Sequence, residues 1–137
     1  GKIADRVGRV PVIKASIFII ILSMLLFSHA VNPMMFYLGS IAFGFGVGIF
    51  FPALTAWTID LGDEQKRGRA LATMYISLEI AIGSGALISG SLVGNHVERL
   101  PVMFYFSAFM CILGLVYLYR IDKNKIIPLI RQMVKKQ

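Results

Sequence analysis

The sequence predicts an all-α membrane protein with four transmembrane helices and both chain ends on the cytoplasmic side. Hydrophobic residues make up 57% of the 137 residues and charged residues only 15%, compared with about 25% charged in soluble domains. The apolar residues form four long runs separated by short charged clusters, which is typical of membrane-spanning helices. Lys and Arg residues gather at alternate ends of these runs, which predicts how the helices are oriented.

Each apolar run is long enough for a helix to cross the ~30 Å hydrocarbon core, which needs about 20 residues. We expect spans at residues 11–30, 34–61, 70–93 and 100–119. Strands of a membrane barrel would alternate apolar and polar residues over ~10 positions, and these runs do not alternate. Four buried helices of a soluble protein are also a poor fit, because little sequence remains to cover them.

The distribution of positive charge predicts the orientation. Of the 14 Lys and Arg residues, four lie at positions 2–14, three at 66–69 and six at 120–136, all on one side of the predicted membrane. Arg99 alone lies on the other side. The side that carries thirteen is cytoplasmic by the positive-inside rule. The net charge of +7 therefore indicates anionic lipid headgroups as partners, and not nucleic acid.

The two ends of the chain differ from the apolar runs. Residues 1–10 form a charged loop, and residues 120–137 form a basic tail. The tail predicts either an amphipathic helix on the inner leaflet or a disordered segment, since Pro128 interrupts its apolar pattern. The chain does not begin with Met and opens inside a charged motif, so we expect a fragment of a longer polypeptide.

The charged loop contains the most specific motif. Its residues Gly1, Asp5, Arg6, Gly8 and Arg9 resemble the cytoplasmic signature of the major facilitator superfamily, G-x-x-x-D-[RK]-x-G-R-[RK], although Val10 stands where the family usually has a basic residue. Residues 60–70 are similar to the loop between the fourth and fifth helices of a six-helix half, where an acidic residue precedes R-G-x-A. The resemblance covers nearly the whole chain.

The resemblance implies a partial six-helix half-bundle, containing helices nine to twelve of a twelve-helix transporter. Run 34–61 lacks the arginine typical of the fourth helix, run 70–93 lacks the Gly-Pro pair of the antiporter motif, and the chain ends in a basic tail. The implied function is secondary active transport of a small solute by alternating access in the cytoplasmic membrane. Protons as coupling partners are suggested by Glu79 alone, and efflux is one direction that the sequence leaves open. The missing N-terminal helices of the same transporter are expected partners.

The resemblance also implies a cytoplasmic gate. An acidic residue at the inner end of the second run, Asp60, is expected to pair with a signature arginine, Arg6 or Arg9. We include Asp5 and Arg69 among the gate candidates, because both lie in the same charged loops. Such a pair would hold the inner face closed and break when that face opens.

Glu79 is the one acidic residue inside an apolar run. It lies ten residues beyond Arg69, which places it about 15 Å into the membrane at ~1.5 Å per residue. A carboxylate near the middle of the bilayer must face a cavity, find a partner or stay protonated. We interpret Glu79 as a candidate proton carrier, with a structural hydrogen bond to another helix as the alternative.

Glycines are concentrated in the second and third runs. Gly44 and Gly48 are four residues apart, as are the small residues that include Gly85 and Gly90 on two faces of the third run. Such spacing lets helix backbones approach closely, for static packing or for a surface that slides. Pro52 removes a backbone hydrogen bond within the second run and predicts a kink.

Three other kinds of protein stay open as alternatives: a membrane scaffold or assembly subunit, a stand-alone four-helix multidrug exporter, and a membrane enzyme. The scaffold would explain the glycines but not Glu79, and the small exporter keeps an essential glutamate in its first helix, where this chain has none. No phosphate-binding loop, nucleophile elbow or metal signature is present, so we expect no enzyme, cofactor or metal site.

Overall fold

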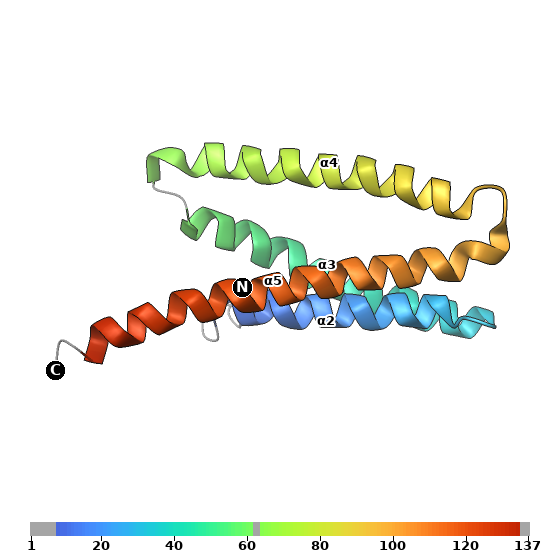
Figure 1. Ribbon diagram of the computed structural model, residues 1–137, viewed down its shortest axis with the longest axis horizontal. Coiled ribbons are helices and arrows are strands. Elements are labelled where there is room, and N and C mark those ends of the chain that lie inside the picture. The colour runs from blue at the N-terminus through green and yellow to red at the C-terminus, as the bar shows by residue number, and fades with distance from the viewer. Residues whose placement is uncertain (1–7, 62–63, 135–137) are drawn as a thin grey trace.

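The computed structural model describes residues 8–61 and 64–134, with the backbone alone at residues 64 and 123–134. The elements are α2 (Arg9–Ser28), α3 (Pro33–Leu61), the 3-10 turn η1 (Glu64–Lys66), α4 (Arg67–Val93), the 3-10 turn η2 (Val97–Arg99) and α5 (Leu100–Val134). Figure 1 shows long helices that run back and forth, joined by turns at alternate ends. Within the described ranges the chain is entirely helical between its turns, so the all-α prediction is confirmed.

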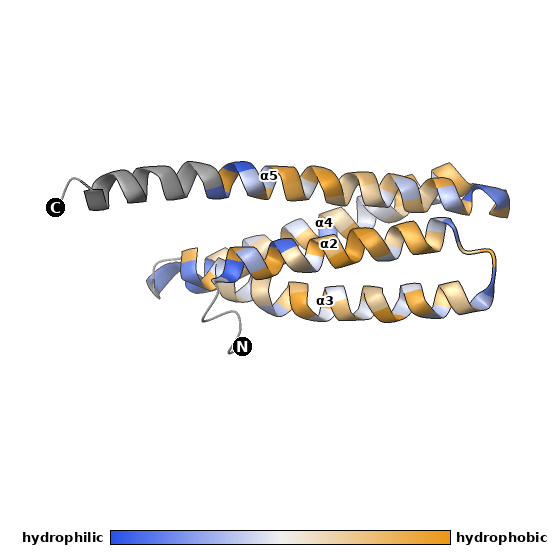
Figure 2. Ribbon diagram, turned by 90° about the horizontal axis from the view of Figure 1, so that it is seen from below, coloured by the Kyte–Doolittle hydropathy of each residue, from blue (hydrophilic) through white to orange (hydrophobic). Residues whose placement is uncertain are grey.

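Among the described residues, four helices are long and apolar enough to cross a membrane: Arg9–Ser28, Pro33–Leu61, Arg67–Val93 and Val97–Asp122. This confirms the predicted number of transmembrane helices. Figure 2 shows hydrophobic residues along the helices and hydrophilic ones gathered mainly toward their ends. At ~1.5 Å per residue, the 20 residues of α2 match a ~30 Å core, whereas the 29 residues of α3 exceed it and require tilt or a projecting end.

Helices α3 and α4 end with their apolar runs, at Leu61 and Val93, but they begin before those runs. Helix α3 begins at Pro33 because Asn32 caps it: Asn32 Oδ1 accepts a hydrogen bond from the Met35 N–H at 3.0 Å. Helix α4 begins at Arg67, within the charged loop. Hydropathy marks the part of a helix that lies in lipid, whereas caps and turns decide where the helix itself begins.

Helix α5 continues from Leu100 to Val134 without a break at residue 120 or at Pro128. Figure 1 shows its C-terminal part extending past the start of α2. The expected tail is therefore helical as far as Val134 and continuous with the last transmembrane helix. That this part lies on the inner leaflet stays a prediction, because its side chains are outside the described residues.

Helix α2 lies between α3 and α5 and supplies most of the core. Ile13, Ile17 and Ile21 recur every fourth residue, so they share one face of α2, and they are buried together with Ala53 of α3. Cys111, Leu115 and Leu118 of α5 pack against this cluster. The core is thus a three-helix seam centred on α2.

Two glycines of α3 allow α2 to approach closely. A Cβ atom on Gly39 would lie 2.9 Å from Phe27 Cε1, and one on Gly46 would lie 2.8 Å from Ile20 Cγ1. Both distances are shorter than real side chains tolerate. Because lipid tails are as apolar as the helices, close van der Waals packing is a main source of helix association in membranes. Gly39, Gly46 and Ala53, seven residues apart, therefore form the contact stripe of α3.

Helix α4 is much less packed than the other three. None of its residues is buried, whereas α2 buries six. A hydrogen bond from Thr58 Oγ1 to Met74 Sδ, at 3.3 Å, joins α3 to α4. Figure 1 shows α4 running separately above the other helices. This helix also carries Glu79, so its exposure bears directly on the candidate site.

Candidate functional site

Helix α2 begins directly after Gly8, at its predicted cytoplasmic end, which we call the inner end, and the backbone there favours glycine. Gly8 has φ of 95°, in the left-handed region that other residues rarely adopt. It caps α2 without a side-chain hydrogen bond, and Arg9 follows as the first helical residue. A cation there faces the positive end of the α2 dipole, so Arg9 needs a nearby carboxylate.

Asp60 of α3 provides that carboxylate. Arg9 Nε donates a hydrogen bond to Asp60 Oδ2, and the two side chains form an ion pair. Asp60 is the next-to-last residue of α3, where the helix dipole is negative, so each charge stands at the unfavourable end of its own helix. The ion pair offsets the unfavourable interaction of each charge with its own helix dipole. The side chains are 30% and 48% exposed, so the pair contributes about 1 kcal/mol or less.

The structure describes only one of the other gate candidates, Arg69. Asp5 and Arg6 lie outside the described residues. Arg69 is exposed in the first turn of α4, where its backbone carbonyl accepts a hydrogen bond from Thr73 Oγ1 at 3.0 Å. The structure therefore brings Arg9 and Asp60 together. Their role as a gate stays a prediction.

A second ion pair lies at the inner end of the seam between α2 and α5. Lys14 Nζ donates a hydrogen bond to Asp122 Oδ2 and lies 4.8 Å from the centre of the Tyr119 ring, within cation–π range. Its side chains are 20% and 24% exposed, less than those of the first pair. Sequence reasoning missed this contact. The available signal was a lysine inside the first apolar run and an acid directly after the fourth.

Glu79 lies near the middle of α4 and is exposed in this chain. Among the described residues, no hydrogen bond or ion pair reaches its carboxylate. The four helices therefore supply neither the partner nor the enclosed cavity that a carboxylate at this depth requires. The role of Glu79 as a proton carrier stays a prediction.

The candidate packing glycines also face open space. A Cβ atom on Gly44, Gly48, Gly85 or Gly90 would meet nothing within 4 Å in this structure. The close approach occurs instead at Gly39 and Gly46. The four-residue spacing of small residues therefore did not identify the glycines of α3 that contact α2. A packing role for the four predicted glycines needs helices other than those described, and it stays a prediction.

The outer end of the seam is held by aromatic and histidine contacts. Phe27 of α2 lies 5.7 Å from Phe36 of α3 and 5.2 Å from Phe104 of α5, measured between ring centres. His29 Nδ1 lies 3.0 Å from the Leu25 carbonyl oxygen, and His29 Nε2 lies 3.0 Å from the Tyr105 hydroxyl oxygen, within hydrogen-bond distance. His29 thus connects the end of α2 to α5.

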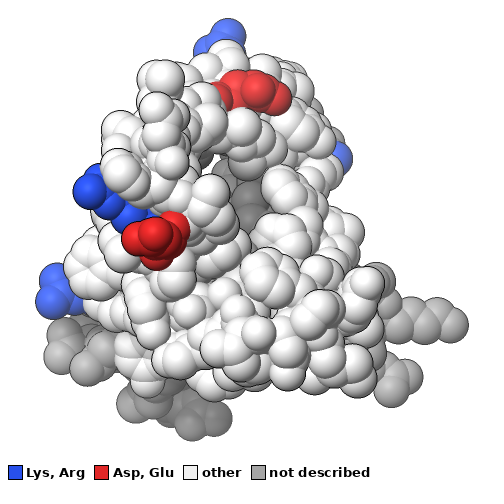
Figure 3. Space-filling model, turned by 90° about the vertical axis from the view of Figure 1, so that its right-hand side faces the viewer, with Lys and Arg blue, Asp and Glu red and all other residues white. Residues whose placement is uncertain are grey.

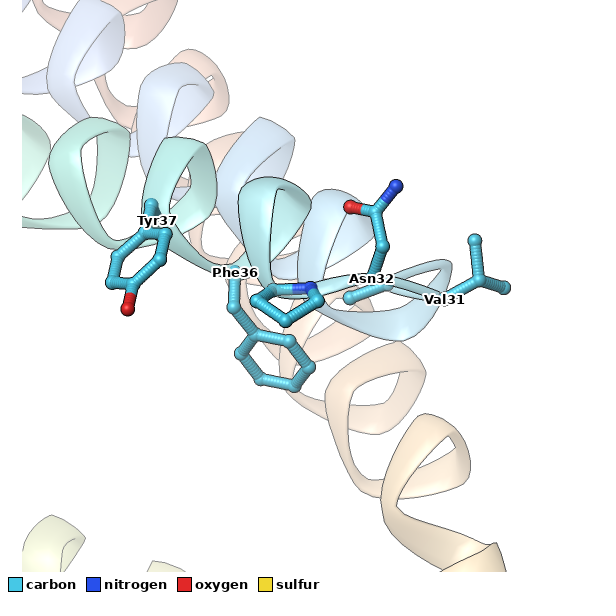
Figure 4. A pocket seen from close by; sticks show the side chains of 6 residues that line it. Val31, Asn32, Phe36 and Tyr37 are labelled. Atoms are coloured by element: carbon cyan, nitrogen blue, oxygen red, sulfur yellow. The ribbon is translucent and has the colours of Figure 1, made fainter.

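The hollow at the outer end of the helices is open to its surroundings. A shallow, open hollow of about 450 Å³ lies beside the turn between α2 and α3, lined by residues 30–33, Phe36 and Tyr37 (Figure 4). The end-on view in Figure 3, from the side of this turn, shows few charged side chains. Within the described residues, no three His, Cys, Asp or Glu side chains gather where they could hold a metal ion.

Four apolar helices, joined at alternate ends, define an integral multi-pass α-helical membrane protein. The chain matches the family model of the Major Facilitator Superfamily over residues 1–133 and belongs to this family. It is 29% identical to Multidrug resistance protein 2 of Bacillus subtilis (strain 168) over 120 residues, which are 85% of this chain and 28% of that protein.

A second relative is the uncharacterized MFS-type transporter YhhS of Escherichia coli (strain K12). It is 26% identical over 122 residues, which are 88% of this chain and 29% of that protein. The chain thus spans less than a third of the length of these curated relatives. No solved structure matches the chain significantly.

Proposed function

We propose that the whole protein is a secondary active transporter of the cytoplasmic membrane that moves a small solute by alternating access. This chain would supply helices nine to twelve. The observation that carries the proposal is the family match over residues 1–133, since no contact within four helices specifies transport by itself. The short match to longer relatives supports the view that other helices of the same protein complete the bundle.

The direction that we propose is efflux, with protons as the coupling ion. The name of the Bacillus subtilis relative, a multidrug resistance protein, supports efflux. Glu79 supports proton coupling, because it is an exposed carboxylate near the middle of a transmembrane helix. Placed against a cavity formed with the missing helices, it could gain and lose a proton as the cavity opens to either side.

The Arg9–Asp60 pair is the proposed inner gate. It joins the inner ends of α2 and α3 and is exposed enough to break at small cost. Its arginine, Arg9, is a residue of the signature motif. Gly48 and Pro52 form a proposed hinge in α3. Pro52 has no N–H to donate to the Gly48 carbonyl one turn earlier, and Gly48 has open space around it.

The test of the proposed function is Glu79→Gln in the full-length protein. The amide keeps the shape of the side chain and removes a charge that is costly in lipid, so the variant should insert at normal levels. Uphill transport should be lost, whereas exchange without a gradient should survive, because a neutral side chain mimics the protonated carboxyl group. Measuring substrate binding, exchange and gradient-driven transport together separates coupling from binding.

Glu79→Asp is the matched control. It keeps a carboxylate one methylene further back, so it should retain part of the uphill transport with an altered pH profile. Weakened substrate binding in Glu79→Gln would instead indicate contact with a cationic substrate. Normal uphill transport by Glu79→Gln, at normal expression, would contradict both roles.

A further inference from the structure

The α5 side of the seam follows one repeating pattern up to its inner end. Ala108 is buried, and Cys111, Leu115 and Leu118 pack against the α2 core. These positions are three, four and three residues apart, so they lie on one stripe of the helix. The next position of the same stripe, four residues after Leu118, is Asp122. A carboxylate therefore stands where the pattern calls for another apolar side chain.

Helix α2 provides a cation that pairs with this carboxylate. Lys14 lies next to Ile13, which is fully buried, and its ammonium group binds Asp122 Oδ2. Tyr119 comes one turn before Asp122 on α5, so it shares the same face, and its ring lies 4.8 Å from Lys14 Nζ. The three side chains form a charged cluster at the inner end of the seam. The buried serines of α2, Ser16 and Ser23, donate hydrogen bonds to carbonyls of their own helix.

Apolar contacts alone define the axial position of α5 on α2 weakly. Both helices are apolar on all sides, and isoleucine and leucine side chains can interlock again after a slip of one turn. A partly buried ion pair cannot do so, because a slip of one turn separates the two charges by about 5.4 Å and leaves both without a partner. A single polar position in a packed helix pair is known to select one register by this means.

We propose that the Lys14–Asp122 pair, covered by Tyr119, sets the register of α5 on α2. The pair differs in this from the Arg9–Asp60 pair, whose side chains are more exposed. The inference does not depend on the proposed transport function. It concerns how two helices of this chain align, and it is tested without a transport assay.

The test is a cross-linking scan at the outer end of the seam in the full-length protein, with Cys111→Ala as background. His29→Cys is combined in turn with Val102→Cys, Tyr105→Cys or Phe109→Cys. These positions lie one turn before the native contact, at it and one turn after it. Removing His29 and Tyr105 also removes the outer hydrogen bond, so that the inner pair is left to hold the alignment. With the pair intact, cross-linking should be efficient at Tyr105→Cys alone.

Lys14→Leu combined with Asp122→Leu removes both charges and keeps the seam apolar. Cross-linking should then fall several-fold at Tyr105→Cys and rise at Val102→Cys or Phe109→Cys. The charge swap, Lys14→Asp with Asp122→Lys, should restore the single register. Arg120→Gln is the control, because it removes an exposed charge two residues from Asp122 and should leave the native pattern unchanged.

An unchanged pattern in the double leucine variant would overturn the proposal, since apolar packing would then set the register alone. If that variant does not accumulate in the membrane, the charge swap decides. A swapped pair that gives the native pattern supports the proposal, and one that cross-links equally at all three positions overturns it.

Discussion

Helix α2 and helix α4 both cross the predicted membrane, yet they are held in very different ways. Helix α2 is tied to its neighbours at both ends, by ion pairs to Asp60 and Asp122 and by aromatic contacts of Phe27. Helix α4 buries none of its residues. The difference teaches that a helix can be specified by hydropathy alone, whereas its place in a bundle needs contacts, and α4 makes few of these with the other described helices.

The largest expected effect tests whether α4 crosses the membrane despite this weak packing. Cysteines at Gln65 and Asn95 flank α4, and one at Asn32 lies in the turn after α2. In intact cells, with Cys111→Ala as background, an impermeant thiol reagent should label Asn32→Cys and Asn95→Cys fully and Gln65→Cys not at all, because positive loops stay inside. Permeabilised cells are the control, in which Gln65→Cys should react. Labelling of Gln65→Cys from outside would contradict the orientation.

The next largest effect tests the close packing of α2 against α3. Gly46→Ala places a methyl group 2.8 Å from Ile20 Cγ1 and 3.3 Å from the Ile20 backbone nitrogen. The backbone cannot rotate away, so overpacking should cost about 1–3 kcal/mol. Thermal unfolding of the purified full-length protein in detergent measures the loss.

Gly44→Ala is the matched control for Gly46→Ala. It lies two residues away on the same helix, where a methyl group meets nothing within 4 Å. The expected change in its free energy of unfolding is about 0.5 kcal/mol or less. Equal losses at the two glycines would show that α3 is not more tightly packed on the side of α2.

The smallest expected effect on stability concerns the exposed Arg9–Asp60 ion pair between α2 and α3. Asp60→Asn or Arg9→Ala should each lower the free energy of unfolding by about 1 kcal/mol or less. Each should also shift the population toward the inward-facing state, measured as reactivity of a cysteine on the inner face. Since the two residues act as a pair, the double variant should be no worse than either single variant. Fully additive losses would argue against a pair.

Much of the fold could be predicted because each transmembrane helix is specified locally. A run of about 20 apolar residues is enough to favour insertion, so the four spans could be located from the sequence alone. The candidate pairing of Asp60 with a signature arginine came from a family resemblance, and the structure describes such a pair at Arg9. Glu79 was found because a carboxylate inside an apolar run is rare.

The sequence by itself determined the number of helices, their order and their predicted orientation, because hydropathy and charge act residue by residue. Only the tertiary structure decided which faces meet. Gly39 and Gly46 contact α2 whereas Gly44 and Gly48 do not, and Lys14 meets a carboxylate 108 residues away in the chain. The physical reason is that these helices are apolar on every side. With no polar face to mark the outside, the contact face is selected by steric fit and a few charges, and those depend on how whole helices align.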